Sequence, residues 1–270
     1  KIVIVGGGSN AWTPNIVKDM LLTDAIAGAE FVLYDVNKAA SDLVAAFLKK
    51  LNKRLGTSST FTSTDNRAKA FAGGDYFIVT ISTGGLKAMA HDLAIPEEYG
   101  ILHTVGDTSG PGGWARTLRN FPVFVALARD INRWAPGAMV LNYTNPMTTL
   151  TAVLARICTG PVVGLCHGVF ENLAFLTRFY KLGSESEISI DYAGLNHFFW
   201  APRVRARGTD VSADLLAKVR KRGFTALLRE AYVDSMGHSS NRELATALFD
   251  ETGVMPDRKS TRLNSSHGKL

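Results

Sequence analysis

The chain has 270 residues, of which 46% are hydrophobic, so it is long enough to bury one large domain or two smaller ones. Its formal charge of +6 falls to +3 when the polar last 14 residues are left out, and +3 is too mild to indicate a polyanionic partner such as nucleic acid. Because no apolar stretch approaches the roughly 20 residues that cross a bilayer, and two cysteines do not make the framework of a secreted scaffold, we expect a globular cytoplasmic protein without a membrane partner.

The first part of the chain alternates short β-branched runs with longer amphipathic stretches. Strands buried on both faces are predicted at residues 2–5, 31–34, 76–81, 138–143 and 161–165, and helices at 15–22, 40–55 and 121–135. Thr13 and Pro14 are predicted to be the N-cap and the first residue of the first helix. This β-α-β rhythm predicts an α/β fold with a Rossmann-like, doubly wound parallel sheet.

A glycine-rich loop directly follows the first predicted strand. Gly6, Gly8 and Ala11 fit the pattern G-x-G-x-x-A, in which glycines let backbone amides approach a pyrophosphate at the positive end of the next helix. The second strand ends at Asp35, where a carboxylate bonds the adenosine ribose and disfavours the 2′-phosphate of NADP. The loop therefore predicts NAD binding, although the 29 residues from Gly6 to Asp35 exceed the usual gap of about 20. The alternative is an ordinary tight turn and a surface aspartate.

Chemically distinctive residues follow the later strands, and ligands of such sheets bind outside the carboxyl ends of the strands. Cys166 follows one strand, and His197 ends a later strand and can reach the same edge. Cys166 is either a small buried hydrophobe or a ligand. Together, a thiolate and an imidazole suit an open metal site that substrate oxygens and water complete. The polar, glycine-rich residues 106–116 are predicted to form a loop at this edge, and Cys158 a structural thiol.

The rhythm changes after about residue 185. Residues 187–208 are predicted to form one or two strands, antiparallel to each other, and helices are predicted from 213 to 248. The domains are therefore expected at 1–185 for nucleotide binding and 186–256 for the beginning of a second α+β domain.

The last residues, 257–270, are polar and have no apolar period. From Asp257 to His267 they resemble the translated read-through of a sequencing-library adapter, so we expect a non-native tail; a disordered natural C-terminus is the alternative. Without the tail, 26 basic residues face 23 acidic ones, which gives a formal charge of +3.

In chain order, the motifs G-G-G-S, L-Y-D, G-D-T-x-G-P-G-G, N-Y-T-N-P-M, C-H-G and G-L-N-H make the chain resemble glycoside hydrolase family four. That family comprises NAD- and manganese-dependent α-glucosidases, α-galactosidases and related uronidases, with a fold like lactate and malate dehydrogenases. The resemblance runs from Lys1 to about Pro256, and family members continue for well over a hundred residues, which implies a C-terminally truncated chain.

The resemblance implies hydrolysis of an α-linked glucoside, galactoside or uronic acid by a route unlike that of most glycosidases. In the family, NAD takes a hydride from the sugar's third carbon, and a base removes the hydrogen on the second carbon. The glycosidic oxygen is then eliminated, water adds, and the same cofactor returns the hydride.

The resemblance also assigns residues. Cys166 and His197 match the ligands of Mn²⁺, and Asn145 matches a residue that contacts the sugar near the nicotinamide. The residues assigned to NAD are Gly6, Gly8, Ser9, Asp35 and Asn145.

The acid and base are less completely assigned. Asp107 is the candidate for proton transfer, and a turn-capping role is its alternative. His167 stands where some branches of the family have an aspartate acid, so the acid is His167 or another residue. The base is expected beyond Pro256.

Two other functions remain open at this point. A 2-hydroxy acid dehydrogenase on the same fold needs no metal and would use Arg116 or Arg119 to bind a carboxylate. A non-catalytic module would bind NAD without reducing it. If the protein is the glycosidase that the resemblance implies, its partner is a small saccharide. The intact protein is then expected to form homo-oligomers, as its relatives do.

Overall fold

The computed structural model describes the chain except for residues 27, 104–106, 109, 232–242, 258–261 and 265–270. Two compact units make up the chain: residues 1–88 with 114–165, and residues 89–113 with 166–270. The sequence placed the boundary at 185 instead, and did not separate residues 89–113 from the first domain. None of the described helices is both long and apolar enough to span a bilayer.

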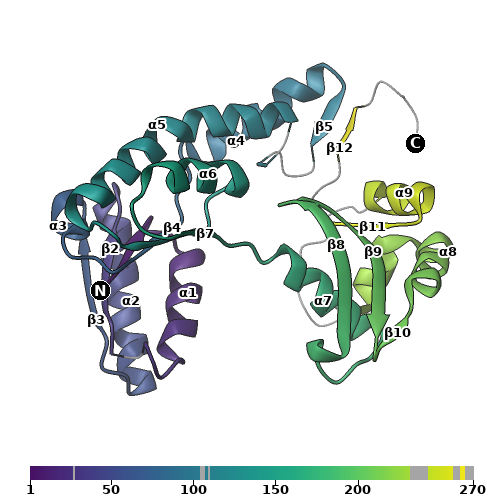
Figure 1. The fold of residues 1–270 in the computed structure, drawn as a ribbon, viewed down its shortest axis with the longest axis horizontal. Helices are drawn as coiled ribbons and strands as arrows, with labels where there is room; N and C mark the ends of the chain where they lie inside the picture. Colours follow the sequence, from purple (N-terminus) through teal and green to yellow (C-terminus); the bar gives the residue numbers. More distant parts are fainter. Residues whose placement is uncertain (27, 104–106, 109, 232–242, 258–261, 265–270) are drawn as a thin grey trace. The chain divides into compact units, whose positions relative to one another are not determined.

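The first unit contains a six-stranded, all-parallel sheet with the order β3-β2-β1-β4-β6-β7 (Figure 1). Its strands are β1 (Ile2–Val5), β2 (Glu30–Tyr34), β3 (Thr60–Thr64), β4 (Tyr76–Val79), β6 (Met139–Asn142) and β7 (Val162–Gly164). The order reverses between β1 and β4, which is the topological switch point of a Rossmann-like fold. The predicted fold class is therefore confirmed.

Helices cover both faces of this sheet. Those of the unit are α1 (Trp12–Leu21), α2 (Lys38–Leu55), α3 (Arg67–Phe71), α6 (Met147–Ile157) and most of α5 (Gly110–Trp134). Ile2 and Ile4 of β1 pack with residues of α1 and α2, whereas Val3 and Val5 pack with residues of α3, α5 and α6. Since successive side chains of a strand point to opposite faces, a strand covered on both sides must be apolar throughout, as β1 is.

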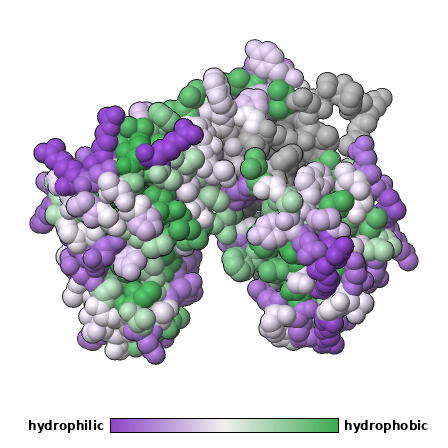
Figure 2. Space-filling view, in the orientation of Figure 1, coloured by the Kyte–Doolittle hydropathy of each residue, from purple (hydrophilic) through white to green (hydrophobic). Residues whose placement is uncertain are grey.

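The surface of this unit carries both polar and apolar side chains. Figure 2 shows hydrophilic and hydrophobic residues interspersed on the visible face. On α2, the exposed side chains Leu43 and Phe47 share the helix with Lys49 and Lys50. Scattered apolar side chains of this kind are normal on a protein surface.

The start of α1 differs from the prediction. The helix begins at Trp12, with Ala11 at the cap position, and the hydroxyl of Ser9 accepts a hydrogen bond from Trp12 N at 3.1 Å. Thr13 is buried inside the helix, where its hydroxyl donates to Gly6 O at 3.4 Å. The prediction of Thr13 as N-cap is therefore wrong, because Ser9 supplies the oxygen that bonds the first turn.

The start of α5 and the existence of α4 (Gly85–Glu98) also differ from the prediction. Residues 110–116, which were predicted to be part of a loop, form the first turns of α5. Pro111 is compatible with this, since a proline in the first turn loses no intrahelical hydrogen bond. Gly106 and Ser109 of the predicted loop lie outside the described residues.

The second unit is built on β8 (Ile188–Leu195) and β9 (Phe198–Ala206), an antiparallel pair that confirms the predicted strands. β9 also pairs with β10 (Thr209–Asp210) and β11 (Met255–Pro256). The remaining elements of the unit are α7 (Gly168–Phe179), η1 (Glu185–Glu187), α8 (Ser212–Ala231), α9 (Glu243–Thr252) and the antiparallel pair β5 (Ile101–His103) and β12 (Arg262–Asn264). Residues of α7, α8, α9 and the sheet form its hydrophobic core.

A buried amide shapes the turn after β6. The side chain of Asn142 donates to Thr144 O at 3.2 Å and to Thr151 Oγ1 at 3.0 Å, and it accepts from Thr144 N at 2.9 Å. The hydroxyl of Thr144 in turn accepts from Ile81 N at 3.0 Å, which joins this turn to the residues after β4. Asn142 therefore sets the path of the chain that leads to Asn145.

Asn142→Leu is expected to lower the free energy of unfolding by about 2–4 kcal/mol, because it leaves buried hydrogen-bonding groups of Thr144 and Thr151 unsatisfied. Chemical denaturation measures the loss. The control is Asn15→Leu, at an exposed position of α1, with an expected change below about 1 kcal/mol. Equal losses in the two variants would contradict the role given to Asn142.

Candidate functional site

The glycine loop after β1 is shaped by its neighbours in the sheet. Gly6 has a φ of +97°, and a Cβ built on it would lie 2.1 Å from Thr80 O, at the end of β4. A Cβ on Gly8 would lie 2.8 Å from Asp35 Oδ2 and 2.9 Å from Ala40 Cβ. The loop therefore needs glycine at both positions to pass between the ends of β2 and β4, at the switch point where such folds bind dinucleotides.

The backbone N–H groups of the glycines donate to residues at the end of β2, whereas the sequence predicted that they approach a pyrophosphate. Gly6 N and Gly7 N both donate to Tyr34 O, at 2.9 and 3.0 Å, and Gly8 N donates to Asp35 Oδ2 at 2.8 Å. They join the loop to β2 instead of facing a pyrophosphate. The group that can face a pyrophosphate is the N-terminus of α1, where the helix dipole is positive.

Asp35 lies beside the glycine loop, as the sequence predicted. Its second oxygen, Oδ1, accepts from Asn37 N at 2.9 Å. An ionised carboxylate has about four acceptor sites, so these two bonds orient Asp35 and leave acceptor capacity for ribose hydroxyls. The crowded glycines and the oriented carboxylate fit a bound dinucleotide.

Asn145 follows β6 in the same unit and is half-buried. The Asn145–Pro146 peptide bond is cis. Its role as a sugar and cofactor contact stays a prediction.

The second unit brings together Cys166 and His197, which are 31 residues apart in the chain. Cys166 Sγ lies 3.3 Å from His197 Nε2 and also accepts from Gly168 N at 3.4 Å. Cys166 precedes α7, and His197 occupies the turn between β8 and β9, where it has a φ of +57° and is 4% exposed. A non-glycine residue with positive φ is uncommon, and such residues cluster at functional sites.

The other ring nitrogen of His197 meets a hydroxyl and a carboxylate. Nδ1 lies 2.7 Å from Thr108 Oγ1 and 3.5 Å from Asp107 Oδ1. Burial alone would lower the pKa of His197, but the hydrogen bonds to Asp107 and Cys166 outweigh it and raise this pKa to about 9. Asp107 therefore lies beside the imidazole, while its role in proton transfer stays a prediction. Sequence reasoning did not single out Thr108, although it follows Asp107 directly.

The pair fits two ligands of one divalent cation. Nitrogen and sulfur donors bind such a metal at about 2.0–2.3 Å, so two of them on one ion lie roughly 3–4 Å apart. Metal-binding histidines use the second ring nitrogen for a hydrogen bond that orients the ring, which is the position of Thr108 and Asp107 here. Within the described ranges, no three His, Cys, Asp or Glu side chains come close enough to hold a metal. The assignment of Cys166 and His197 as metal ligands stays a prediction.

The remaining candidates lie in different surroundings. His167 is the residue before α7, and its Nε2 lies 3.0 Å from Glu171 Oε1. Its role as an acid stays a prediction. Burial raises the pKa of Cys158 to about 11, so its thiol stays protonated, as a structural cysteine should.

Asp257, the first residue of the predicted tail, is fully buried, and its backbone N donates to Phe199 O at 2.8 Å. A Cβ built on Gly168 would lie 3.6 Å from Cys166 Sγ and 3.9 Å from Asp257 Oδ1. The carboxylate of Asp257 thus lies near the turn that carries Cys166.

Comparison with known proteins assigns a family. The model described as family 4 glycosyl hydrolase matches residues 1–182. The chain is 35% identical over 243 residues to an α-galactosidase of Bacillus subtilis (strain 168), covering 88% of this chain and 56% of the relative. It is 32% identical over 271 residues to an α-galacturonidase of the same strain, covering 95% and 58%. This chain therefore spans somewhat more than half the length of these relatives.

Among solved structures, a 6-phospho-α-glucosidase from gut microorganisms, in complex with NAD and glucose-6-phosphate, has a TM-score of 0.81 and 28% identity. The similarity covers 95% of this chain and 59% of that one. The family model, the two relatives and the shared fold agree: the chain belongs to glycosyl hydrolase family 4.

Proposed function

We propose that the chain is the NAD- and Mn²⁺-binding part of a longer α-glycosidase that oxidises and re-reduces its sugar during hydrolysis. The observation that carries this proposal is the 3.3 Å approach of Cys166 Sγ to His197 Nε2. Most glycosidases flank the scissile bond with two carboxylates, and a thiolate with an imidazole cannot replace these. The pair suits a divalent cation whose remaining positions are filled by sugar oxygens and water.

The chemistry of the two cofactors explains why such residues serve a glycosidase. When bound, the nicotinamide exchanges a hydride with the sugar's third carbon, and the divalent cation supplies the Lewis acidity that makes the hydrogen on the second carbon removable. The chain's own residues bind and orient. Cys166 and His197 hold the cation, and the hydroxyl of Thr108 with the carboxylate of Asp107 orients the His197 ring through its Nδ1.

The remaining roles follow from position. The glycine loop and Asp35 bind the adenosine half of NAD, Asn145 orients the sugar hydroxyls, and Asp107 or His167 transfers a proton. A relative of 28% identity holds NAD in its structure, which supports the choice of dinucleotide.

The substrate that we propose is a small α-linked glycoside. The names of the two relatives compared above, α-galactosidase and α-galacturonidase, favour a galactoside or a uronic acid over a glucoside. A cytoplasmic location and a homo-oligomeric state of the complete protein are part of the same proposal.

The test is hydrolysis of an α-glycoside in D₂O by the complete protein. Removal of the hydrogen on the second carbon and its return from solvent place one deuterium on that carbon of the product, which NMR detects. A product without deuterium there would contradict the mechanism. Treatment with EDTA distinguishes the proposed glycosidase from a metal-independent dehydrogenase. EDTA should abolish hydrolysis by the glycosidase until Mn²⁺ is restored, whereas it should leave a metal-independent dehydrogenase active.

Thr108→Val is expected to weaken Mn²⁺ binding about tenfold, because valine keeps the shape of threonine and removes the hydroxyl beside His197 Nδ1. Competition titration with a metal indicator measures the affinity. Thr209→Val, at an exposed position of β10, is the control and should bind Mn²⁺ like the original chain. Unchanged affinity in Thr108→Val would show that the hydroxyl does not orient the metal ligand.

A further inference from the structure

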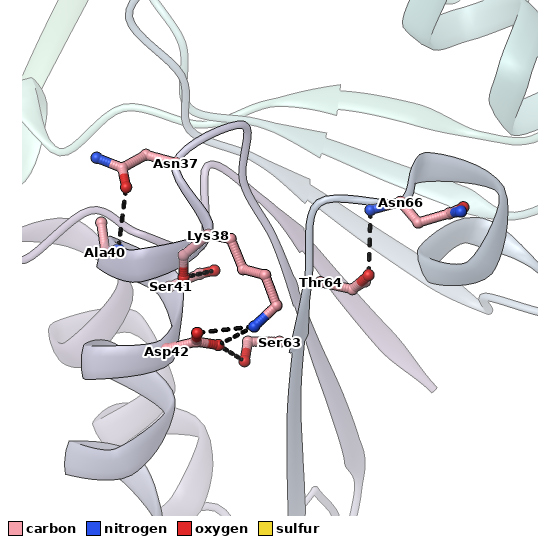
Figure 3. Close-up of polar contacts among 8 residues, drawn as sticks. All are labelled: Asn37, Lys38, Ala40, Ser41, Asp42, Ser63, Thr64 and Asn66. Atoms are coloured by element: carbon pink, nitrogen blue, oxygen red, sulfur yellow. Dashed lines mark hydrogen bonds and ion pairs between the residues drawn. The ribbon is translucent and has the colours of Figure 1, made fainter.

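A lysine at the start of α2 is held by an aspartate one helical turn later (Figure 3). Lys38 Nζ donates to both oxygens of Asp42, at 2.8 and 2.7 Å. Ser63, at the end of β3, donates to Asp42 Oδ1 at 2.5 Å. The hydrogen bonds from Lys38 and Ser63 keep the pKa of Asp42 below its usual value, so Asp42 is charged near neutral pH. The ammonium of Lys38 therefore has an anionic partner on its own helix and is oriented toward β3.

This pair lies next to the residues that the proposed function assigns to the adenosine ribose. Asn37, the residue before Lys38, donates its backbone N–H to Asp35 Oδ1 at 2.9 Å. In the same turn, Ala40 N donates to Asn37 Oδ1 at 3.2 Å. A Cβ built on Gly8 would lie only 2.9 Å from Ala40 Cβ. The first turn of α2 thus packs directly on the glycine loop, and Lys38 is the first cation after Asp35 in the chain.

The first cation after β3 is also bound to a carboxylate. Arg67 NH1 donates to Asp130 Oδ2 at 2.7 Å, and its Nε donates to Tyr34 OH at 3.3 Å. Rossmann folds that accept NADP place a cation where the ribose carboxylate otherwise stands, because the 2′-phosphate needs a charged donor. Here, the cations that follow β2 and β3 already have partners inside the protein.

We propose that Asp42 is a determinant of cofactor specificity, which withholds Lys38 from the 2′-phosphate of NADP while Asp35 repels that phosphate. The inference rests on the proposed function, since it assumes that the glycine loop and Asp35 bind the adenosine half of a dinucleotide. According to this inference, selection against NADP needs two residues: Asp35 repels the 2′-phosphate, and Asp42 keeps Lys38 from binding it. Removing the charge of Asp35 alone leaves Lys38 in its ion pair with Asp42.

The test measures dissociation constants of NAD and NADP by isothermal titration calorimetry for four proteins: the original chain, Asp35→Asn, Asp42→Ala, and the double variant. Asp42→Ala alone should leave both constants nearly unchanged, because Asp35 still repels the phosphate. The double variant should bind NADP about two- to threefold more tightly than Asp35→Asn, because the gain is limited to the cost of breaking an exposed ion pair one helical turn long. Adding Lys38→Gln to the double variant should remove this gain.

Two controls make the result specific. Asp19→Ala removes one negative charge from α1 and, combined with Asp35→Asn, should give no gain in NADP affinity. Asp42→Asn keeps the size of the side chain and, in place of Asp42→Ala, should give the same gain if the charge of Asp42 is what holds Lys38. Asp42 is half-exposed, so neither change removes core packing.

The outcomes separate this inference from the function on which it rests. If the original chain binds neither nucleotide, both the proposed function and the inference fail. If it binds NAD and the double variant gains no NADP affinity over Asp35→Asn, the inference alone is wrong. A gain that survives Lys38→Gln would equally overturn it, since Lys38 would not be the group that binds the phosphate.

Discussion

Cys166→Ser is expected to weaken Mn²⁺ binding by about 100-fold or more, whereas Cys158→Ser should leave the affinity unchanged. A serine hydroxyl stays protonated near neutral pH and is a poor replacement for a thiolate ligand, and changes even in the groups around a ligand cost 10- to 100-fold in affinity. Electron paramagnetic resonance of free Mn²⁺ in a titration measures both constants.

Cys158 is the matched control because the two cysteines lie in different surroundings. Cys158 is a protonated thiol at the end of α6, packed against the core of the first unit, whereas Cys166 lies 3.3 Å from an imidazole nitrogen. If Cys166→Ser binds Mn²⁺ as tightly as Cys158→Ser, the pair of Cys166 and His197 is not the metal site.

Gly6→Ala is expected to lower the free energy of unfolding by about 3 kcal/mol or more and to abolish measurable NAD binding. The added Cβ would lie 2.1 Å from Thr80 O, so either the loop or the end of β4 must move, and the φ of +97° adds strain for any L side chain. Chemical denaturation measures the stability, and fluorescence titration with NAD measures the binding.

Gly137→Ala separates the two effects of that substitution. Gly137 has a φ of +82°, but a Cβ there would meet no atom within 4 Å. Its cost should therefore be the backbone strain alone, about 1–2 kcal/mol, with NAD affinity retained. Equal losses of stability in the two variants would mean that the glycine loop is not constrained by its contact with β4.

The sheet could be predicted from the sequence because its central strands β1, β2 and β4 are buried on both faces. Ile2 to Val5 are all apolar, and a continuous run of this kind is readable without knowing its neighbours. β3 was missed because it is an edge strand with a single buried residue, Phe61, which stacks on Phe31 with ring centroids 5.1 Å apart. One apolar residue among threonines and a serine gives no periodic signal.

The site could be predicted only in part. Cys166 and His197 were found because each follows or ends a strand and each has distinctive chemistry. Thr108 was missed because its contact with His197 spans 89 residues and a hydroxyl looks like any polar loop residue. The direction of the glycine amides also depends on tertiary structure, since Tyr34 O accepts from both Gly6 and Gly7 only once β2 lies beside the loop.

Cobalt(II) tests most directly whether the thiolate of Cys166 and the ring of His197 bind one divalent cation. Cobalt(II) bound to a thiolate has a charge-transfer absorption in the near ultraviolet that oxygen and nitrogen ligands alone do not produce. We expect this band when the chain is titrated with Co²⁺, its loss in Cys166→Ser, and its retention in Cys158→Ser. A titration without the band, or a band that Cys166→Ser leaves unchanged, would contradict the account.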